Sequence, residues 1–267
     1  MNTISFITAN FVAREAGFAL TEGWHQGNNA TNDYFRPIDT FPKRFEALLK
    51  EIKQLGFQAI DLWIAHLHWA WATREHTKIA NSLIAKHRLQ IASLAGNFGA
   101  TRMEFEAACK LANTMELRLL VGGASYFYYN RQAAIEILRK HRLELAIVNH
   151  QETSAEKLLE KVGTDNHDVI GVAIDTGWYA TLGNGLFLAI EKLAPNLKMV
   201  QLKNLVNENS KETAAYDDGV VPLQSCVEKL IEIRYNGPVA IEHHPFDRNP
   251  TGECQMSLEM LTRWLST

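Results

Sequence analysis

Acidic side chains in this sequence stand directly after short apolar runs, at positions where strands are predicted to end. Asp175 follows the run 169–174, and Glu242 follows the run 238–241. A carboxylate at the end of a buried strand is costly unless it is paired, hydrogen-bonded or bound to a metal. These two acids are therefore predicted to be functional groups, suited to proton transfer or to cation binding.

Aromatic, imidazole and amide side chains follow the other apolar runs. Alone, each is more often a packing or surface residue than a ligand-binding residue. Together they suit a polyhydroxylated molecule, because flat rings cover the apolar faces of a sugar while amides and imidazoles bond its hydroxyl groups. The residues expected to bind such a substrate are Trp24, Trp63, His66, His68, Asn97, Trp178 and Gln201.

The elements that must position these groups are eight apolar runs, spaced by about 30 residues as in α/β barrels and mostly separated by helical stretches. Near-continuous apolar composition is typical of parallel strands that are buried on both faces. We therefore expect an α/β fold, a single-domain (β/α)8 TIM barrel over residues 1–267 with its site at the carboxyl ends of the strands. A doubly wound open sheet is the alternative, but no glycine-rich phosphate loop follows the first run. The predicted strands are 4–9, 59–63, 89–94, 117–121, 143–148, 169–174, 199–202 and 238–241.

Helices are predicted between these runs. Apolar residues at a 3.6-residue period, from Phe45 to Leu55, predict a helix that Thr40 would cap and Gly56 would end, and residues 153–156 are typical of a capping box. The polar stretch between the first run and about residue 39, which is rich in Gly, Asn and Asp, predicts a loop that carries Trp24. The other predicted helices are 74–87, 103–115, 131–141, 185–193, 223–233 and 257–265.

Composition excludes several classes of function. The 267 residues carry a net charge of -3 without a basic stripe, so no nucleic-acid partner is expected. No apolar stretch reaches the roughly 18 residues of a membrane span, and the first residues lack the features of a signal peptide. Three well-separated cysteines fit a reducing compartment. We expect a cytoplasmic protein with a small-molecule partner, and a homo-oligomer remains open.

Several segments, in this order and spacing, resemble those of the xylose isomerase-like barrels, which include sugar-phosphate isomerases and epimerases, inosose isomerases and dehydratases, and ketose 3-epimerases. The likeness runs over nearly the whole chain, and no single motif is decisive. The segments are LGFQAIDLW at 55–63, NH at 149–150, VAIDTG at 172–177, QLKN at 201–204, DGVV at 218–221 and GPVAIE at 237–242.

The resemblance implies a divalent metal on four side chains, a Glu, an Asp, a His and a Glu, one from each of strands five to eight. In that family the metal holds two sugar oxygens and stabilises an enediolate, and the two glutamates move the proton. Asp175 and Glu242 stand at two of these positions, but Val148 and Gln201 stand where the other Glu and the His are expected. Trp178 stands where many members have a substrate-binding histidine. A divalent metal (Mg, Mn or Zn) on Asp175, Glu242 and Gln201 is therefore expected to be weak or absent.

Two hypotheses follow. The first is a sugar, sugar-phosphate or cyclitol isomerase, epimerase or dehydratase in which Glu242 is the acid or base and Lys203 stabilises an enolate oxygen. His150, two residues past Val148, would face the same way and could replace the missing ligand or base. Members of the family with an intact glutamate often have that histidine too, however, so it need not compensate. The second is a metal-free relative that binds a sugar-like ligand without the family's isomerase chemistry. An endonuclease is a poor third, since it needs a multi-metal cluster and a basic surface.

Overall fold

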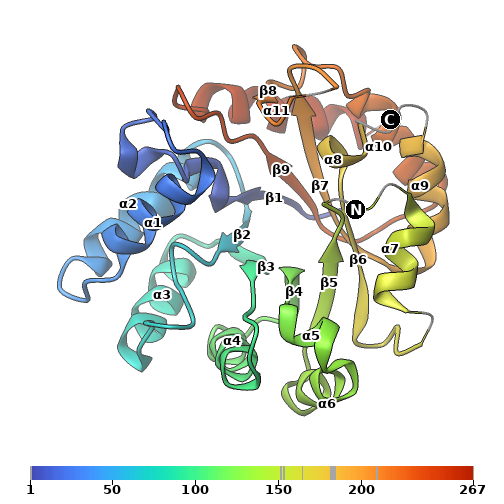
Figure 1. The fold of residues 1–267 in the computed structure, drawn as a ribbon. Coiled ribbons are helices and arrows are strands. Elements are labelled where there is room, and N and C mark those ends of the chain that lie inside the picture. The colour runs from blue at the N-terminus through green and yellow to red at the C-terminus, as the bar shows by residue number, and fades with distance from the viewer. Residues whose placement is uncertain are drawn as a thin grey trace.

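Eight short apolar segments pair in parallel, and the pairing closes on itself in the computed structural model, which describes residues 2–150, 152, 154–163, 165–180, 185–208 and 210–266 (Figure 1). The order around the sheet is β1-β2-β3-β4-β5-β6-β7-β9, and β9 pairs back to β1. The predicted single-domain (β/α)8 barrel is thus confirmed, and the open sheet is excluded. The strands are β1 (Ile4–Ile7), β2 (Ala59–Trp63), β3 (Gln90–Asn97), β4 (Leu119–Gly123), β5 (Glu144–Val148), β6 (Ile170–Asp175), β7 (Leu197–Leu205) and β9 (Val239–Glu242).

β7 is longer than its apolar run predicts. The run 199–202 is apolar except for Gln201, but the strand continues through Leu205, where it pairs with the short antiparallel strand β8 (Thr213–Ala214). The polar ending is tolerated because the Asn204 side chain bonds the carbonyl oxygens of Ala215 and Tyr216. Lys203 therefore lies within a rigid strand rather than in the loop that follows it.

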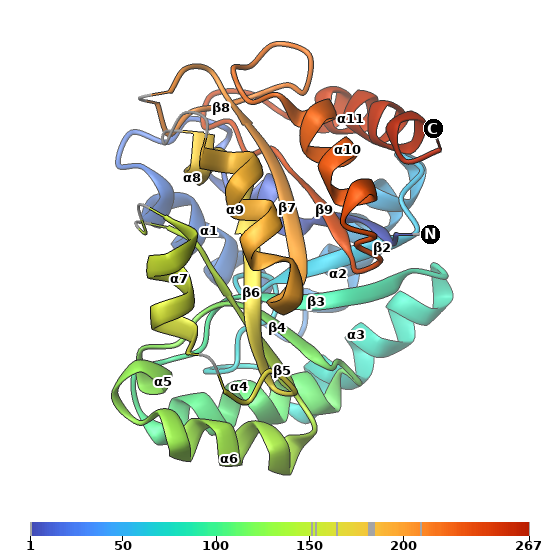
Figure 2. The same ribbon diagram turned by 90° about the vertical axis from the view of Figure 1, so that its right-hand side faces the viewer.

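Helices surround the barrel (Figure 1), and α7, α9 and α10 lie outside β6, β7 and β9 (Figure 2). Thr73 and Thr101 form capping boxes, whereas the hydroxyl of Thr40 precedes α2 but bonds Pro37 O at 3.3 Å instead of capping it. Ser154 caps α7, and Thr153 lies outside the described residues. The helices are α1 (Trp24–Phe35), α2 (Phe41–Gln54), α3 (Arg74–Lys86), α4 (Arg102–Thr114), α5 (Ser125–Tyr129), α6 (Arg131–His141), α7 (Ala155–Val162), α8 (Thr176–Ala180), α9 (Gly185–Leu193), α10 (Leu223–Glu232) and α11 (Thr251–Trp264).

The prediction of a loop between β1 and about residue 39 is wrong, because the second half of this segment forms the helix α1. Its sequence WHQGNNATNDYF has low helix propensity and little apolar periodicity. Tertiary contacts hold it instead. Thr31 donates to Val12 O at 3.2 Å, Phe35 is buried, and a Cβ at Gly27 would lie 2.6 Å from Val12 O.

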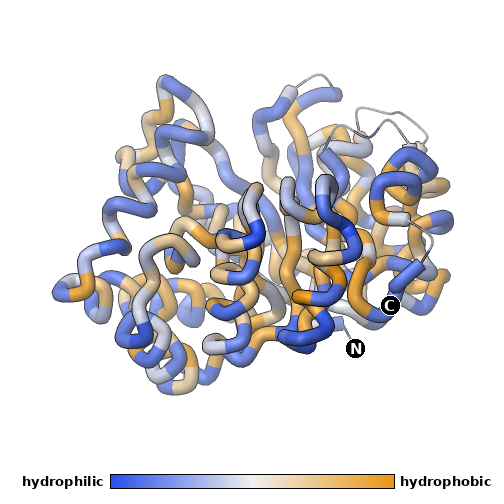
Figure 3. The backbone as a smooth tube through the Cα atoms, turned by 60° about the horizontal axis from the view of Figure 1, so that its bottom comes forward, coloured by the Kyte–Doolittle hydropathy of each residue, from blue (hydrophilic) through white to orange (hydrophobic). Residues whose placement is uncertain are grey.

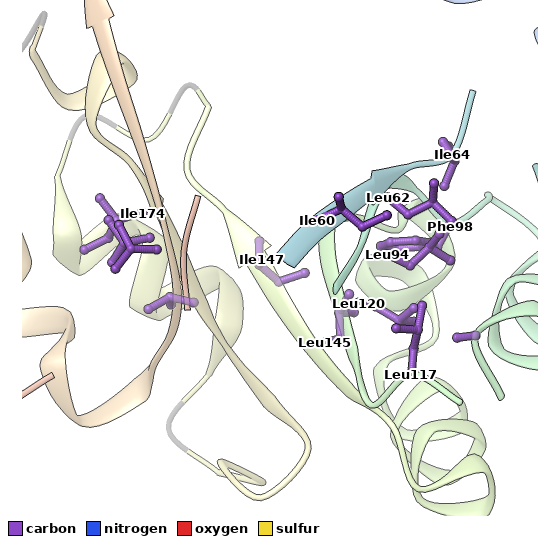
Figure 4. Close-up of a cluster of buried hydrophobic side chains, with 14 of the residues drawn as sticks. Ile60, Leu62, Ile64, Leu94, Phe98, Leu117, Leu120, Leu145, Ile147 and Ile174 are labelled. Carbon is purple, nitrogen blue, oxygen red and sulfur yellow. The ribbon is translucent and has the colours of Figure 1, made fainter. Parts of the chain in front are cut away.

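Two apolar layers follow from the alternation of side chains along the strands. Large residues point outward against helices whose hydrophilic and hydrophobic residues alternate along the chain (Figure 3), and Figure 4 shows Ile60, Leu94 and Leu120 in this outer layer. The inward residues form a separate cluster in which five of the nine are alanines: Ile7, Ala9, Ala95, Val121, Ala146, Val148, Ala173, Met199 and Ala240. The small residues among them leave space inside the barrel toward the carboxyl ends of the strands. None of the described helices is both long enough and apolar enough to cross a membrane.

Candidate functional site

A cavity of ≈ 830 Å³ lies at the carboxyl ends of the strands. The small inward residues and the glycines of β3 and β4 form part of its wall, so its size follows from the alternation just described. Such a volume suits a small polar ligand with its first water molecules. Of the predicted site residues, it is lined by Trp24, Trp63, Asn97, His150, Asp175, Trp178, Gln201, Lys203 and Glu242.

Three charged side chains lie together on the β6–β7–β9 side of this cavity. Lys203 Nζ donates to Asp175 Oδ2 and, at 3.1 Å, to Glu242 Oε1. Their side chains are 8%, 3% and 10% exposed. Because β7 lies between β6 and β9 and pairs Lys203 with Glu242, the ammonium is placed between the two carboxylates by the strand register.

Neighbouring groups hold this cluster in place. Asn149 clamps the Asp175 backbone, accepting from its N–H at 2.7 Å and donating to its carbonyl at 3.1 Å. Thr176 clamps Lys203 in the same way, since Oγ1 accepts from Lys203 N at 2.8 Å and donates to Lys203 O at 2.9 Å. Gly177 N donates to Asp175 Oδ1 at 2.9 Å. The Asn149-His150 and Asp175-Thr176-Gly177 segments thus position the cluster.

The electrostatics follow from burial and from these contacts. Burial would raise the pKa of Glu242, but the Lys203 ammonium and the His244 hydrogen bond outweigh it and hold the pKa at about 2. Burial raises the pKa of Asp175, and Lys203 opposes the rise. Burial alone would lower the pKa of Lys203, but the two carboxylates hold it above its usual value. Lys203 is therefore an ammonium and Glu242 a carboxylate at neutral pH.

Glu242 keeps one oxygen for the cavity. Its Oε1 accepts from Lys203 and pairs with His244 Nε2 at 3.1 Å. Within the described part of the chain, no group donates to Oε2. A carboxylate oxygen that lines a cavity without a donor can accept a proton from a bound molecule.

Aromatic rings build the walls. Trp24 packs edge-on against Trp63 with centroids 5.5 Å apart and against His244 at 4.8 Å. Asn28 of α1 accepts from Trp63 Nε1 at 2.9 Å and so fixes that ring. Trp178, on the other side, lies between two cations, with its centroid 5.8 Å from Lys203 Nζ and 5.7 Å from Lys211 Nζ. Rings at opposite walls suit the stacking of a sugar ring.

His150 presents a proton acceptor to the cavity from the β5 side. Its Nδ1 lies 3.2 Å from Val148 O, and because a carbonyl oxygen only accepts, Nδ1 carries the hydrogen. The neutral ring therefore has its acceptor at Nε2, for which the described residues provide no partner.

His66 and His68 are predicted substrate-binding residues that the structure does not bring to the cavity. His66 is 1% exposed, its Nδ1 lies 3.2 Å from Thr8 Oγ1, and burial lowers its pKa to about 3. His68 accepts from Ala70 N at 3.0 Å and packs against Trp69. Both come after β2 has ended, where the inward and outward alternation no longer applies. They are neutral residues that hold the loop after β2.

Sequence reasoning missed several residues of the lining. Glu152 and Lys211 belong to loops that no periodicity places, and His244 and Phe246 lie beyond the last apolar run. The signal that could have found His244 is its alternation with Glu242, because residues two apart on an extended chain face the same way.

The donor set does not fit a divalent metal. Of the four positions that would hold it, Val148 offers no donor, Gln201 offers a neutral amide, and the two carboxylates are bound by Lys203. Among the residues that the structure describes, no three His, Cys, Asp or Glu side chains are grouped to hold a metal ion. Sites for Zn or Mn need three or four anionic or imidazole donors.

The comparisons with known proteins agree on the fold. The sequence model of the xylose isomerase-like TIM barrel family matches residues 49–264. A xylose isomerase-like TIM barrel protein from Mycobacterium smegmatis, solved in complex with magnesium, has a TM-score of 0.71 at 16% identity, covering 100% of this chain and 97% of that chain. D-psicose 3-epimerase from Clostridium cellulolyticum H10, solved with D-tagatose, has a TM-score of 0.67 at 14% identity, covering 83% and 93%. The probable 3-DHS dehydratase AsbF from Bacillus anthracis has a TM-score of 0.68 at 14% identity, covering 98% and 99%. These identities show the fold alone, and no curated protein matches the chain.

Proposed function

This chain belongs to the xylose isomerase-like TIM barrel family, and from that premise we propose that it is a sugar isomerase or epimerase. Its substrate would be a sugar-like polyhydroxylated carbonyl compound bound at the mouth of the barrel. The reaction would be proton transfer at a carbon next to the carbonyl group. Structural neighbours that carry the names of a ketose 3-epimerase and of a dehydratase support this class of chemistry.

The observation that carries the proposal is the buried pair of Glu242 and Lys203 beside the cavity. Glu242 Oε2 is an acceptor to which none of the described residues donates, so it would take the proton from carbon. The negative charge that then develops on the carbonyl oxygen is best stabilised by a cation already in place. The Lys203 ammonium, 3.1 Å from Glu242 Oε1, is that cation. Trp24, Trp63 and Trp178 would cover the apolar faces of the sugar, and Gln201 and Asn97 would bond its hydroxyls.

Return of the proton needs an acid. Glu242 itself would return it to the neighbouring carbon in a one-base isomerisation. In an epimerisation His150 would first have to take a proton from solvent on Nε2, the ring atom left for the ligand, and would then donate it from the β5 side. Val148 removes the carboxylate that would otherwise serve there. The one-base isomerisation therefore needs fewer proton-carrying groups at this site than the epimerisation does.

The second candidate function is sugar binding without turnover. The observation that favours it is again Val148, because the side opposite Glu242 has lost a proton carrier of carboxylate strength. The substrate-binding walls do not depend on that residue. Ligand binding and turnover must therefore be measured separately.

Both candidates are tested by a thermal-shift screen against aldoses, ketoses, sugar phosphates and inositols. A compound that binds the native state raises the unfolding temperature. Any compound that does so is then incubated with the protein in D₂O, and its C–H signals are followed by NMR. Isomerisation or epimerisation would exchange the proton next to the carbonyl, and Glu242→Gln would reduce that exchange by roughly 10²–10⁴-fold while the thermal shift remains. A shift without either exchange or formation of the isomeric sugar would instead support the binding protein, and no shift with any class would contradict both.

A further inference from the structure

We propose that the Lys203 ammonium occupies the cation position between Asp175 and Glu242, so that the site works without a divalent metal. The exclusion of metal is independent of the proposed function. The role of the ammonium in turnover rests on that function.

The position of the ammonium is set by three neighbouring strands. Asp175 ends β6, Glu242 ends β9, and Lys203 lies on β7 between them. The register pairs Asp175 with Gln201 and Lys203 with Glu242. Lys203 Nζ donates to one oxygen of each carboxylate. A metal ion that bridged these same two oxygens would have to occupy the place of Nζ.

The ammonium cannot easily leave that place. Its side chain is 8% exposed, and its backbone N–H and carbonyl are both bonded by Thr176 Oγ1. The stem passes so close to Gly177 that a Cβ there would lie 2.8 Å from Lys203 Cε. A swing toward solvent would leave two carboxylates close together in a buried site without a counter-charge, which is strongly unfavourable.

The other two positions of the family's ligand set provide no charged donor for a metal ion. Val148 is apolar, and Gln201 carries a neutral amide that lines the cavity. A divalent ion placed beside Lys203 would be repelled by the ammonium in a site of low dielectric constant. Two of the usual donors are missing, and the other two already neutralise a cation of the chain itself. These observations point to an internal replacement of the metal.

The experiment is a titration of the purified, dialysed full chain with MnCl₂, in which free Mn²⁺ is followed by electron paramagnetic resonance. The unchanged protein is expected to bind no Mn²⁺ up to about 1 mM. Lys203→Met keeps most of the stem but removes the charge, and Lys203→Ala also removes the stem. Each is expected to gain at least tenfold in Mn²⁺ affinity, because two carboxylates and the Gln201 oxygen then face an empty cation position. Lys211→Met, a lysine of the same cavity that contacts Trp178 instead of the carboxylates, is the matched control and is expected to gain nothing.

A second set of variants distinguishes the effect of the missing donors on Mn²⁺ affinity from the effect of the Lys203 ammonium. Val148→Glu with Gln201→His restores the donor types but keeps the ammonium. The addition of Lys203→Ala restores the donors and removes the ammonium. We expect the triple variant to bind Mn²⁺ at least tenfold more tightly than the double variant. Equal affinities would overturn the blocking role of Lys203, even if the single Lys203 variants did not fold.

Two results on the unchanged protein would also overturn the inference. One is an equivalent of Zn²⁺, Mn²⁺ or Mg²⁺ that survives dialysis. The other is turnover of a sugar that EDTA abolishes and Mn²⁺ restores, which would leave the proposed function intact. Conversely, if the variants show the expected Mn²⁺ affinities but no sugar is turned over, the proposed function is contradicted and this inference is not.

Discussion

Replacement of Lys203 by methionine tests the electrostatics of the site without any substrate. The methionine keeps an apolar stem of similar length and removes the charge between Asp175 and Glu242. Because the three side chains are 8%, 3% and 10% exposed, solvent screens the lost interaction very little. Removal of one partner from a buried ion pair costs about 3–5 kcal/mol, since the charge left behind has no partner.

The pKa of Glu242 gives a second magnitude for the same interaction. It is about 2 in the folded protein, whereas an unfolded glutamate titrates near 4.3. Each pKa unit is worth about 1.4 kcal/mol, so this carboxylate contributes about 3 kcal/mol of stability at neutral pH. Because its folded pKa is depressed, that contribution is present above about pH 4 and is lost as the pH falls toward 2.

The sign reverses in the variant. Without Lys203, burial raises the pKa of Glu242, and it raises that of Asp175 further than in the unchanged protein. A carboxyl with a raised folded pKa costs stability as the pH rises above its unfolded value. The loss caused by Lys203→Met is therefore expected to be about 3–5 kcal/mol at pH 8 and clearly smaller at pH 4.

The assay is urea unfolding of both proteins at the two pH values, followed by circular dichroism. Lys211→Met is the control, and its effect is expected to stay within about 0.5 kcal/mol because Lys211 is an exposed lysine. Asp175→Asn, added to Lys203→Met, is expected to recover part of the loss at pH 8 by removing one of the two unpaired charges. A loss below about 1 kcal/mol at pH 8, or an equal loss at both pH values, would refute the reasoning.

Three further predictions follow from single positions. Trp178→Ala is expected to weaken the binding of any sugar found in the thermal-shift screen by about tenfold, through lost stacking, and isothermal titration that shows no change would contradict its place in the wall. Gly122→Ala is expected to cost at least about 3 kcal/mol of unfolding free energy, because φ is +145° and the new Cβ would collide with Gly96 O, whereas Gly123→Ala meets nothing within 4 Å and serves as the control. Burial raises the pKa of Asp61 to about 6, so the unchanged protein should lose about 2 kcal/mol of stability through this group as the pH rises from 4 to 7. In Asp61→Asn that pH-dependent loss should disappear from urea unfolding, and an unchanged slope would mean that Asp61 is ionised at low pH.

The strands of this fold could be predicted from the sequence because each is buried on both faces and is therefore a near-continuous apolar run. The helix α1 could not, since its residues favour a turn and it is held by contacts with distant segments, such as Asn28 with Trp63 and Thr31 with Val12. Periodicity detects a buried face only when that face is apolar, and of the residues that α1 buries (Gly27, Thr31 and Phe35) only Phe35 is a large apolar residue.

The candidate site was predictable where a side chain lies on a strand. Asp175 and Glu242 were found because they end apolar runs, and Lys203 and Gln201 line the cavity beside them. The contact between Lys203 and Glu242 was not predictable, because the two residues lie 39 positions apart and their contact depends on strand register. For His66 and His68 the expectation did not hold geometrically, because the chain turns after Trp63 and buries or redirects both rings.

The departures from the family's ligand pattern are best understood as one electrostatic arrangement. Asp175 and Glu242 are too deeply buried to remain ionised without a cation, whatever the site does. A metal would supply that cation only with further donors, and Val148 and Gln201 do not provide them. An ammonium needs no such donors, because each of its hydrogens requires only one acceptor, and Lys203 finds two of them in the carboxylates. A single positive charge also leaves the pair of carboxylates with an excess of one negative charge, while Lys203 and His244 hold the pKa of Glu242 at about 2. The departures at positions 148 and 201, together with the ammonium of Lys203, therefore leave a carboxylate beside a fixed cation, which is the pair of groups that proton transfer next to a carbonyl requires.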